Sequence, residues 1–166
     1  MRLLLLFIGL LSCSYSVAQT KPSDTINQLW QALSREPNQT PDIAVMKSLL
    51  HPEAMVYGAQ LKEGQHTLSA ITGSKFIELL DKAYESGFYE CEVARTMQVY
   101  DRFAHVYSVV ESRSKRDQID DDFVGVNSIQ LYKMNDEWKI LSLYYHIETP
   151  DNAVSLEGGV SGVCLD

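Results

Sequence analysis

The sequence predicts an α+β fold, in which three N-terminal helices pack on a long curved antiparallel sheet. Apolar residues recur with the period of a helix up to Gly87, and with the period of a strand from there to Glu148. Helices that precede a run of antiparallel strands gather on one face of the sheet. No repeat breaks this order, so residues 19–152 are predicted to form one domain, followed by a flexible tail over residues 153–166.

Apolar stripes and capping residues predict the helices. Ser23 or Asp24 can cap the first helix, and Thr40-Pro41-Asp42 opens a second that ends at His51-Pro52. A third helix is expected from about residue 74 to residue 87, after a short strand over 54–57 and a polar loop through residue 64. The residues expected to face the core are Ile26, Leu29, Trp30, Leu33, Ile43, Met46, Leu49, Leu50, Phe76, Leu80, Ala83 and Tyr84.

The later strands are predicted to pair as two hairpins. Residues 90–100 and 103–114 flank Asp101-Arg102, and residues 123–134 and 137–148 flank Asn135-Asp136. A two-residue turn at Asn135-Asp136 puts Leu131 opposite Ile140 and Asn127 opposite Tyr144. A bulge would reverse part of this assignment. The face expected to point toward the helices carries Cys91, Val93, Arg95, Ser108, Val110, Asn127, Ile129, Leu131, Trp138, Ile140, Tyr144 and His146. The opposite face is expected to carry Glu90, Glu92, His105, Tyr107, Glu111, Val126, Tyr132, Leu141, Leu143, Tyr145 and Ile147.

The outer face of this predicted sheet is unusually apolar. Its set of Val126, Tyr132, Leu141, Leu143 and Tyr145 is too large to leave in contact with water. A second copy of the chain, packed sheet against sheet, would cover it. The sequence therefore predicts a homodimer through the outer sheet face.

The order of these elements resembles the nuclear transport factor 2-like superfamily, which includes polyketide-cyclase-like (SnoaL-like) and ketosteroid-isomerase-like proteins. Three helices precede long curved strands, which close with Trp138-Lys139-Ile140 and then Glu148-Thr149-Pro150-Asp151-Asn152. The resemblance covers roughly residues 24–152. Within the superfamily, the chain is similar to a group of secreted bacterial members without an assigned activity. The resemblance implies a cone-shaped pocket between the helices and the concave sheet face. Because this fold carries enzymes, ligand binders and interaction modules, the resemblance indicates a fold and leaves the function open.

The polar residues expected on the concave face are the candidate ligand-binding residues: Tyr57, Arg95, Ser108, Asn127, Tyr144 and His146. His146 is the candidate general acid or base because imidazole titrates near neutral pH, and Tyr144 is a second catalytic candidate. Arg95 either pairs with an acid such as Asp81 or Glu53, or receives an anionic ligand.

Two functional classes follow from these candidates. The first is a small-ligand-binding or interaction domain, whose ligand is anionic or aromatic. The second is a lyase- or isomerase-type enzyme that acts on a small organic molecule. Steroid isomerases of this fold use a carboxylate base, and the face assignment leaves no Asp or Glu on the concave strands. We therefore expect binding without chemistry, and we expect no metal and no cofactor because no motif for either is present.

Charge argues against two classes of partner. The chain has 22 acidic and 14 basic residues, for a net charge of −8. Affinity for phosphates needs clustered cations, so neither a nucleic acid nor an anionic membrane surface is expected as a partner. The single basic cluster, residues 113–116, runs directly into acidic residues and is interpreted as a solvated loop.

The first residues predict export. An apolar run over residues 3–11 and small residues at Ser16 and Ala18 match a signal peptide over residues 1–18, cut before Gln19. The run is too short to span a bilayer. A lipoprotein anchored at Cys13 is the alternative, since residues 10–13 resemble a lipobox. Outside the cytoplasm, Cys91 and Cys164 could form a disulfide or remain separate thiols, and their spacing favours neither.

Overall fold

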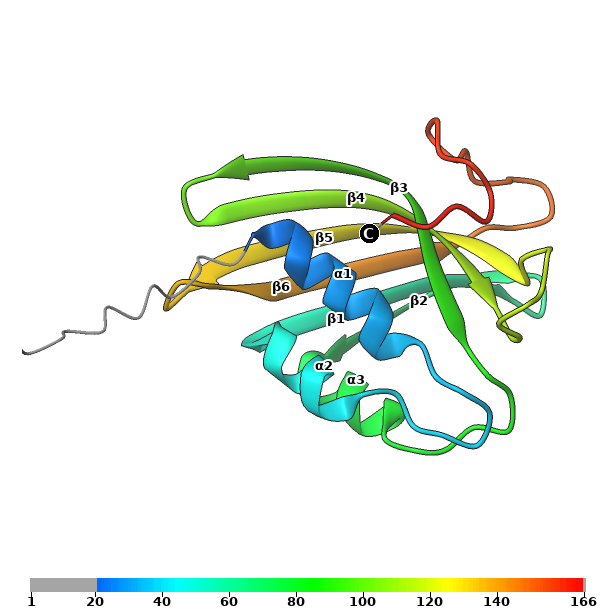
Figure 1. Ribbon diagram of the computed structural model, residues 1–166, viewed down its shortest axis with the longest axis horizontal. Coiled ribbons are helices and arrows are strands. Elements are labelled where there is room, and N and C mark those ends of the chain that lie inside the picture. Colours follow the sequence, from blue (N-terminus) through cyan, green and yellow to red (C-terminus); the bar gives the residue numbers. More distant parts are fainter. Residues whose placement is uncertain (1–20, 166) are drawn as a thin grey trace, which may run out of the picture.

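The computed structural model describes residues 21–165 and has an α+β architecture, as predicted. Figure 1 shows three helices gathered on one side of a long, curved sheet. The elements are α1 (Pro22–Leu33), α2 (Ile43–Leu49), β1 (Leu50–Lys62), β2 (Gln65–Thr72), α3 (Gly73–Leu80), β3 (Tyr89–Tyr100), β4 (Phe103–Arg113), β5 (Phe123–Met134) and β6 (Glu137–Ile147). The predicted signal peptide and the lipobox lie outside the described residues.

The sheet has six strands in the order β2-β1-β6-β5-β4-β3. All neighbours are antiparallel except β1 and β6, which run parallel. The predicted short strand and polar loop are therefore wrong: this segment forms the long hairpin β1–β2, with a turn at Glu63 and Gly64. Strand β2 is almost fully exposed, so it has no apolar pattern from which it could be predicted. The third helix also ends earlier than expected, at Leu80.

Both predicted hairpins are confirmed. Tyr100 pairs with Phe103, and Met134 pairs with Glu137. Asn135 and Asp136 both have positive φ angles, of 51° and 64°, which is the backbone of the two-residue turn that best fits the twist of paired strands.

Side chains cap two of the helices on the inner side of the sheet. The Asp42 carboxylate accepts a hydrogen bond from the Val45 amide at 3.0 Å, and the Thr72 hydroxyl accepts one from the Lys75 amide at 3.2 Å. The inward stripe of α1 packs on the sheet in one hydrophobic core. The largest fully buried side chains of this core are Ile26, Leu29, Met46, Ile129, Leu131, Ile140, Val56 and Val106.

Two bulges decide which residues face this core. In β6 the register passes from Leu131–Ile140 to Gln130–Ser142, so Leu141 is an extra residue. In β3, which is sharply bent (Figure 1), the register passes from Glu92–Val110 to Ala94–Val109, so Val93 is extra. A bulge shifts the alternation of a strand by one residue, which exchanges the faces beyond it.

The bulges correct the predicted faces in two places. Beyond Leu141, Leu143 and Tyr145 face the helices, and Tyr144 and His146 face outward. Before Val93, Glu90 and Glu92 face the helices, whereas Cys91 and Val93 face outward. The assignments for β4 and β5 are confirmed, because neither strand contains an extra residue when the two pair with each other.

The C-terminal segment covers part of the outer face. Val154 and Leu156 pack against an outer cluster of Cys91, Val93, Val109 and Val124. A disulfide joins Cys91 to Cys164, and the Leu165 amide donates to the Glu92 carbonyl oxygen at 2.7 Å. The sequence left open whether these two cysteines form a disulfide or remain separate thiols, and the structure shows the disulfide. The flexibility of residues 153–166 stays a prediction. None of the described helices is long and apolar enough to cross a membrane.

Candidate functional site

An inner cavity of about 240 Å³ lies between the helices and the inner face of the sheet. Most of its lining is apolar, and the polar lining groups are Glu90, Ser112, Asn127 and the hydroxyl of Tyr145. An apolar cavity with a few polar groups has the usual composition of a small-molecule site. Its lining residues are Trp30, Leu33, Phe76, Leu80, Phe88, Glu90, Val110, Ser112, Phe123, Gly125, Asn127, Leu143, Tyr145 and Ile147.

Glu90 is the titratable carboxyl of this cavity. Strand β3 carries it inward because it lies before the bulge, where it pairs with Ser112. The Ser112 hydroxyl donates to its carboxylate at 2.8 Å. Burial raises the pKa of Glu90 to about 7, although the Ser112 hydrogen bond and the charge of Arg35 both act to lower it. Glu90 therefore exchanges a proton near neutral pH.

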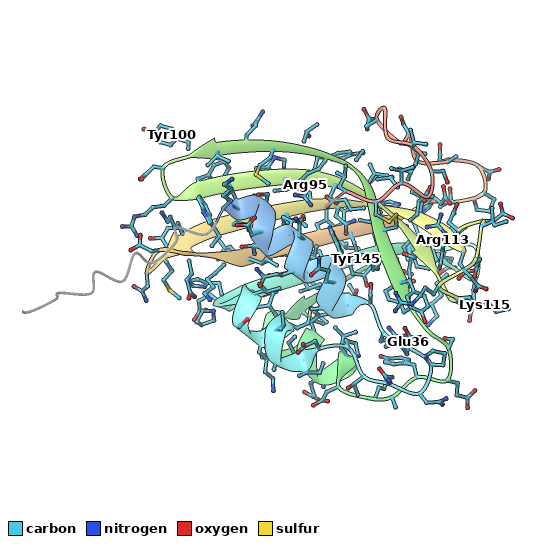
Figure 2. All side chains as sticks on the ribbon, in the orientation of Figure 1. Glu36, Arg95, Tyr100, Arg113, Lys115 and Tyr145 are labelled. Atoms are coloured by element: carbon cyan, nitrogen blue, oxygen red, sulfur yellow. A yellow bond between two sulfur atoms is a disulfide. The ribbon has the colours of Figure 1, made fainter. Side chains whose placement is uncertain are left out.

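Tyr145 contributes a phenol to the cavity because a glycine leaves room for it. Gly58 of β1 pairs with Tyr145 of β6, and a Cβ atom at Gly58 would lie 2.3 Å from the phenol oxygen. A side chain at this position would displace the Tyr145 ring from its place. Tyr145 lines the cavity together with Trp30 and Leu33 of α1, and Figure 2 labels it beside that helix. Within the described part of the chain its hydroxyl makes no hydrogen bond.

Asn127 and Ser108 face inward as predicted. They pair with each other across β4 and β5, and Asn127 also pairs with Tyr145. Asn127 lines the cavity and its amide has no hydrogen-bond partner in the described residues. The Ser108 hydroxyl is fully buried and unpartnered among the same residues, but it does not line the cavity. Of these two candidates the structure brings only Asn127 to the cavity.

Arg95 faces inward, but an acid of its own strand occupies it. Its Nε donates to Glu92 at 2.9 Å, its Nη2 donates to the second oxygen of Glu92, and Nη2 also reaches the Asn27 side chain of α1 at 2.5 Å. The predicted pairing with an acid is therefore correct in kind, while Asp81 and Glu53 are the wrong partners. Figure 2 places Arg95 beside α1. Because Arg95 does not line the inner cavity, its role is to fasten α1 to the sheet.

Three predicted site residues lie on the outer face instead. Tyr57 pairs with Tyr144 across β1 and β6, so both are on the side away from the helices. Tyr144 is 39 % exposed, and its hydroxyl is 3.5 Å from Nδ1 of His146. His146 lines an outer hollow of about 410 Å³ together with His66 and Tyr107. The placement of these residues in the concave pocket was wrong. The bulge at Leu141 turns Tyr144 and His146 of β6 outward, and Tyr57 of β1 lies on the same face because it pairs with Tyr144.

The sequence reasoning missed Glu90 and Tyr145 for different reasons. In β6 the apolar alternation changes phase, from Trp138 and Ile140 to Leu143 and Tyr145, which is the signal of a bulge between them. In β3 no such signal exists. Cys91 and Val93 are apolar, and only the C-terminal segment that covers them explains why they face outward.

A larger, more polar groove of about 900 Å³ adjoins the inner cavity. It lies between α1, the start of β3, the loop after β4 and the C-terminal segment, and it shares Trp30 and Glu90 with the cavity. At one edge Tyr89 donates to Glu36 at 2.6 Å and Arg116 pairs with the same carboxylate. These hydrogen bonds, that of Arg116 first, lower the pKa of Glu36. Among the described residues no group of three or more His, Cys, Asp or Glu side chains could hold a metal ion.

The fold is shared with solved structures of low sequence identity. A protein of unknown function with a cystatin-like fold from Nostoc punctiforme PCC 73102 has a TM-score of 0.58 at 11 % identity, over 77 % of this chain and 89 % of that one. A candidate ketosteroid isomerase from Parabacteroides distasonis ATCC 8503 has a TM-score of 0.56 at 13 % identity, over 83 % and 96 %. An NTF2-like protein of unknown function from Shewanella baltica OS155 has a TM-score of 0.54 at 12 % identity, over 76 % and 90 %.

These similarities establish a class. The chain has the nuclear transport factor 2-like fold, which confirms the resemblance read from its strands. No protein-family model matches the sequence, and no curated protein matches it. At identities of 11–13 % the similarity concerns the fold and assigns no activity.

Proposed function

We propose that the chain binds a small, mainly apolar organic molecule in the inner cavity. The observation that carries this proposal is the cavity itself, which is lined mainly by apolar side chains of α1, α3 and the sheet. Such a lining removes apolar ligand surface from water, and the unpartnered groups of Asn127 and Tyr145 can orient a polar substituent. The volume of about 240 Å³ suits a ligand with one or two rings.

A cavity-filling variant tests this proposal. A Cβ atom at Gly125 would meet a single neighbour, the His146 carbonyl oxygen, at an ordinary 3.6 Å, so Gly125→Leu should be tolerated by the backbone and fill the cavity. Native mass spectrometry of protein from its own host should find a small molecule on the wild type and not on Gly125→Leu. Gln130→Leu, on the outer face of the same strand, should retain it. Equal loading of the wild type and Gly125→Leu would contradict the proposal.

A second candidate function is proton transfer, as in an isomerase or a lyase. Glu90 supports it, because a general acid or base works best when its pKa is close to the operating pH, and that of Glu90 is about 7. The sequence predicted no acid on the concave strands, whereas the bulge in β3 turns Glu90 toward the helices. The candidate ketosteroid isomerase of the same fold is consistent with this class.

In this reading each group has one role. The Glu90 carboxylate takes a proton from a carbon next to a carbonyl group, and the electron pair of that C–H bond moves toward the carbonyl oxygen. The Tyr145 hydroxyl donates a hydrogen bond to the oxygen as it becomes negative. Glu90, now a carboxylic acid, returns the proton to a carbon of the enolate. This sequence needs no metal and no redox partner.

Proton exchange on a small ketone measures this activity directly. With 2-tetralone in D₂O at about pH 7, the wild type should speed replacement of the hydrogens next to the carbonyl, and Glu90→Gln should lower the rate by roughly two to four orders of magnitude. Binding of the ketone should survive in Glu90→Gln, because glutamine fills the same space. His146→Ala, on the outer face, should exchange like the wild type. If exchange were lost in His146→Ala and kept in Glu90→Gln, the reaction would take place on the outer face of the sheet, and the proposal would be wrong.

We also propose export, with cleavage before Gln19. The disulfide between Cys91 and Cys164 supports an oxidising compartment. Intact mass of the mature protein should begin at Gln19, and a diacylglycerol adduct on Cys13 would identify the lipoprotein alternative. Mature protein that retains residues 1–18 would contradict both.

A further inference from the structure

The groove beside the inner cavity contains three guanidinium groups, of which two are committed. Arg113 pairs with Glu111 at 2.7 Å beneath the C-terminal segment, and Arg116 pairs with Glu36. Each of these cations already has a carboxylate, which lowers its affinity for an additional anion. The third guanidinium is that of Arg35, at the end of α1.

Arg35 is held without a carboxylate partner. Its Cζ lies 4.1 Å from the ring centre of Tyr84 and 5.0 Å from that of Phe88, so two aromatic rings fix its position. Its Nε is buried and has no hydrogen-bond partner, and within the described residues its side chain makes no ion pair. A buried, unsatisfied donor on a cation costs free energy unless a partner arrives. Two aromatic rings therefore hold the guanidinium of Arg35 in place, and its N–H groups have no hydrogen-bond acceptor among the described residues.

The position of Arg35 relates it to the inner cavity. Arg35 lines the groove, the groove and the cavity share Trp30 and Glu90, and the charge of Arg35 acts on Glu90. A ligand can consequently place an apolar ring in the cavity and an anionic group at Arg35. A planar carboxylate fits this cation best, because a guanidinium presents paired donors in the spacing of the two carboxylate oxygens.

We propose that Arg35 binds the carboxylate of an aromatic or similarly apolar carboxylic acid whose ring occupies the inner cavity. This assignment rests on the proposed ligand site and adds the charge class of the ligand. Arg35 thus takes the anion-binding role that the sequence placed at Arg95, since Glu92 occupies Arg95. Glu90, at the junction, helps when protonated, because its hydroxyl can donate to the ligand, and it repels the anion when ionised.

Two matched probes separate the ring from the charge. The probes are 2-naphthoate and 2-naphthamide, which share a ring system and differ in the charged group. Titration calorimetry at about pH 6, below the pKa of Glu90 of about 7, should show both probes bound, with 2-naphthoate tighter by roughly ten- to a hundredfold. Arg35→Gln should remove this preference and leave 2-naphthamide affinity unchanged. Arg35→Lys, which keeps the charge and loses the paired donors, should retain part of it.

Arg116→Gln is the control, because Arg116 lines the same groove with its charge already paired to Glu36. It should keep the preference for 2-naphthoate within twofold. Should Arg35→Gln fail to fold, as seen by circular dichroism, the comparison of the two probes on the wild type and on Arg35→Lys still decides. Equal affinities of the wild type for the two probes, or an undiminished preference in Arg35→Gln, would overturn the carboxylate assignment and leave the cavity proposal standing. Binding of neither probe would overturn the cavity proposal and this assignment with it.

Discussion

At the scale of single residues, Glu90 is the titratable carboxyl that distinguishes the candidate site. Its carboxyl has a folded-state pKa of about 7, above the ordinary value of 4.5, and the main cause is burial. Between those two pH values the folded chain keeps a proton that the unfolded chain has released. The free energy of unfolding therefore falls as the pH rises from about 4.5 to 7, and this contribution is constant above that range. Ionisation of Glu90 therefore costs folding free energy at neutral pH, and strongly shifted carboxyl groups cluster at functional sites.

Glu90→Gln should remove this pH-dependent cost. Glutamine is neutral at every pH, so the variant should gain on the wild type by about 3 kcal/mol between pH 4 and pH 8, the free energy that corresponds to moving a pKa from 4.5 to about 7. Urea unfolding at a series of pH values measures the difference. Glu53→Gln, at an exposed position of β1, is the control and should run parallel to the wild type. A Glu90→Gln curve parallel to the wild type as well would show that Glu90 titrates normally.

At the scale of elements, the bulges in β3 and β6 build the site. Each adds one residue to a strand, and the addition turns Glu90 and Tyr145 from the outer face to the cavity. The same shift removes Tyr144 and His146 from it. Two insertions of one residue thus replace a predicted histidine–tyrosine site with a carboxyl–phenol site.

Two leucines of β6 test the position of the bulge: Leu141, which is the extra residue, and Leu143, which lies just beyond it. Leu143 is 2 % exposed in the core and Leu141 is 37 % exposed. Leu143→Glu should cost several kcal/mol of unfolding free energy or prevent folding, because it buries an unpaired charge. Leu141→Glu should change it by about 0.5 kcal/mol or less, as surface substitutions do. Urea unfolding of the two variants is the measurement, and equal costs would contradict the assigned register.

At the scale of the whole molecule, the C-terminal segment and the outer face complete the fold. The disulfide holds the segment over an outer apolar cluster and beside the polar groove, close to Arg113 (Figure 2). The remaining outer face still exposes Phe103, Tyr132 and Leu141, although Leu143 and Tyr145 have left it. The predicted homodimer therefore has a smaller apolar surface to cover than the sequence indicated.

Cys164→Ser should lower the unfolding free energy by about 2–4 kcal/mol, because the bridge closes a loop of 73 residues in the unfolded chain. The disulfide-free chain should also bind more of a dye that senses exposed apolar surface, since Val154 and Leu156 can leave the outer cluster. Reduction of the wild type with a small thiol should reproduce both effects. If the unfolding free energy of Cys164→Ser equalled that of the wild type, packing alone would hold the C-terminal segment.

The homodimer through the outer face stays a prediction, now with different residues at its centre. Tyr132→Glu should shift a dimer toward monomer in sedimentation, because it places a charge among the exposed apolar side chains that the second copy would cover. Lys62→Glu, at the exposed end of β1, is a control away from that patch. A wild type that sediments as a monomer at high concentration would end the dimer proposal.

The sequence by itself determined the α+β class, both later hairpins and the faces of β4 and β5, because strict alternation and turn residues are local signals. From the site it predicted only Asn127 correctly at the cavity wall. The tertiary structure decided the rest. Strand β2 is almost fully exposed, and its only neighbour in the sheet is β1. The outward placement of Cys91 and Val93 depends on the C-terminal segment that covers them, and the partner of Arg95 is Glu92 of its own strand and not a distant acid. A bulge adds only one residue to a strand, so the sequence shows little sign of it. In the folded sheet, however, that residue reverses the alternation, and the side chains beyond it change between the core face and the outer face.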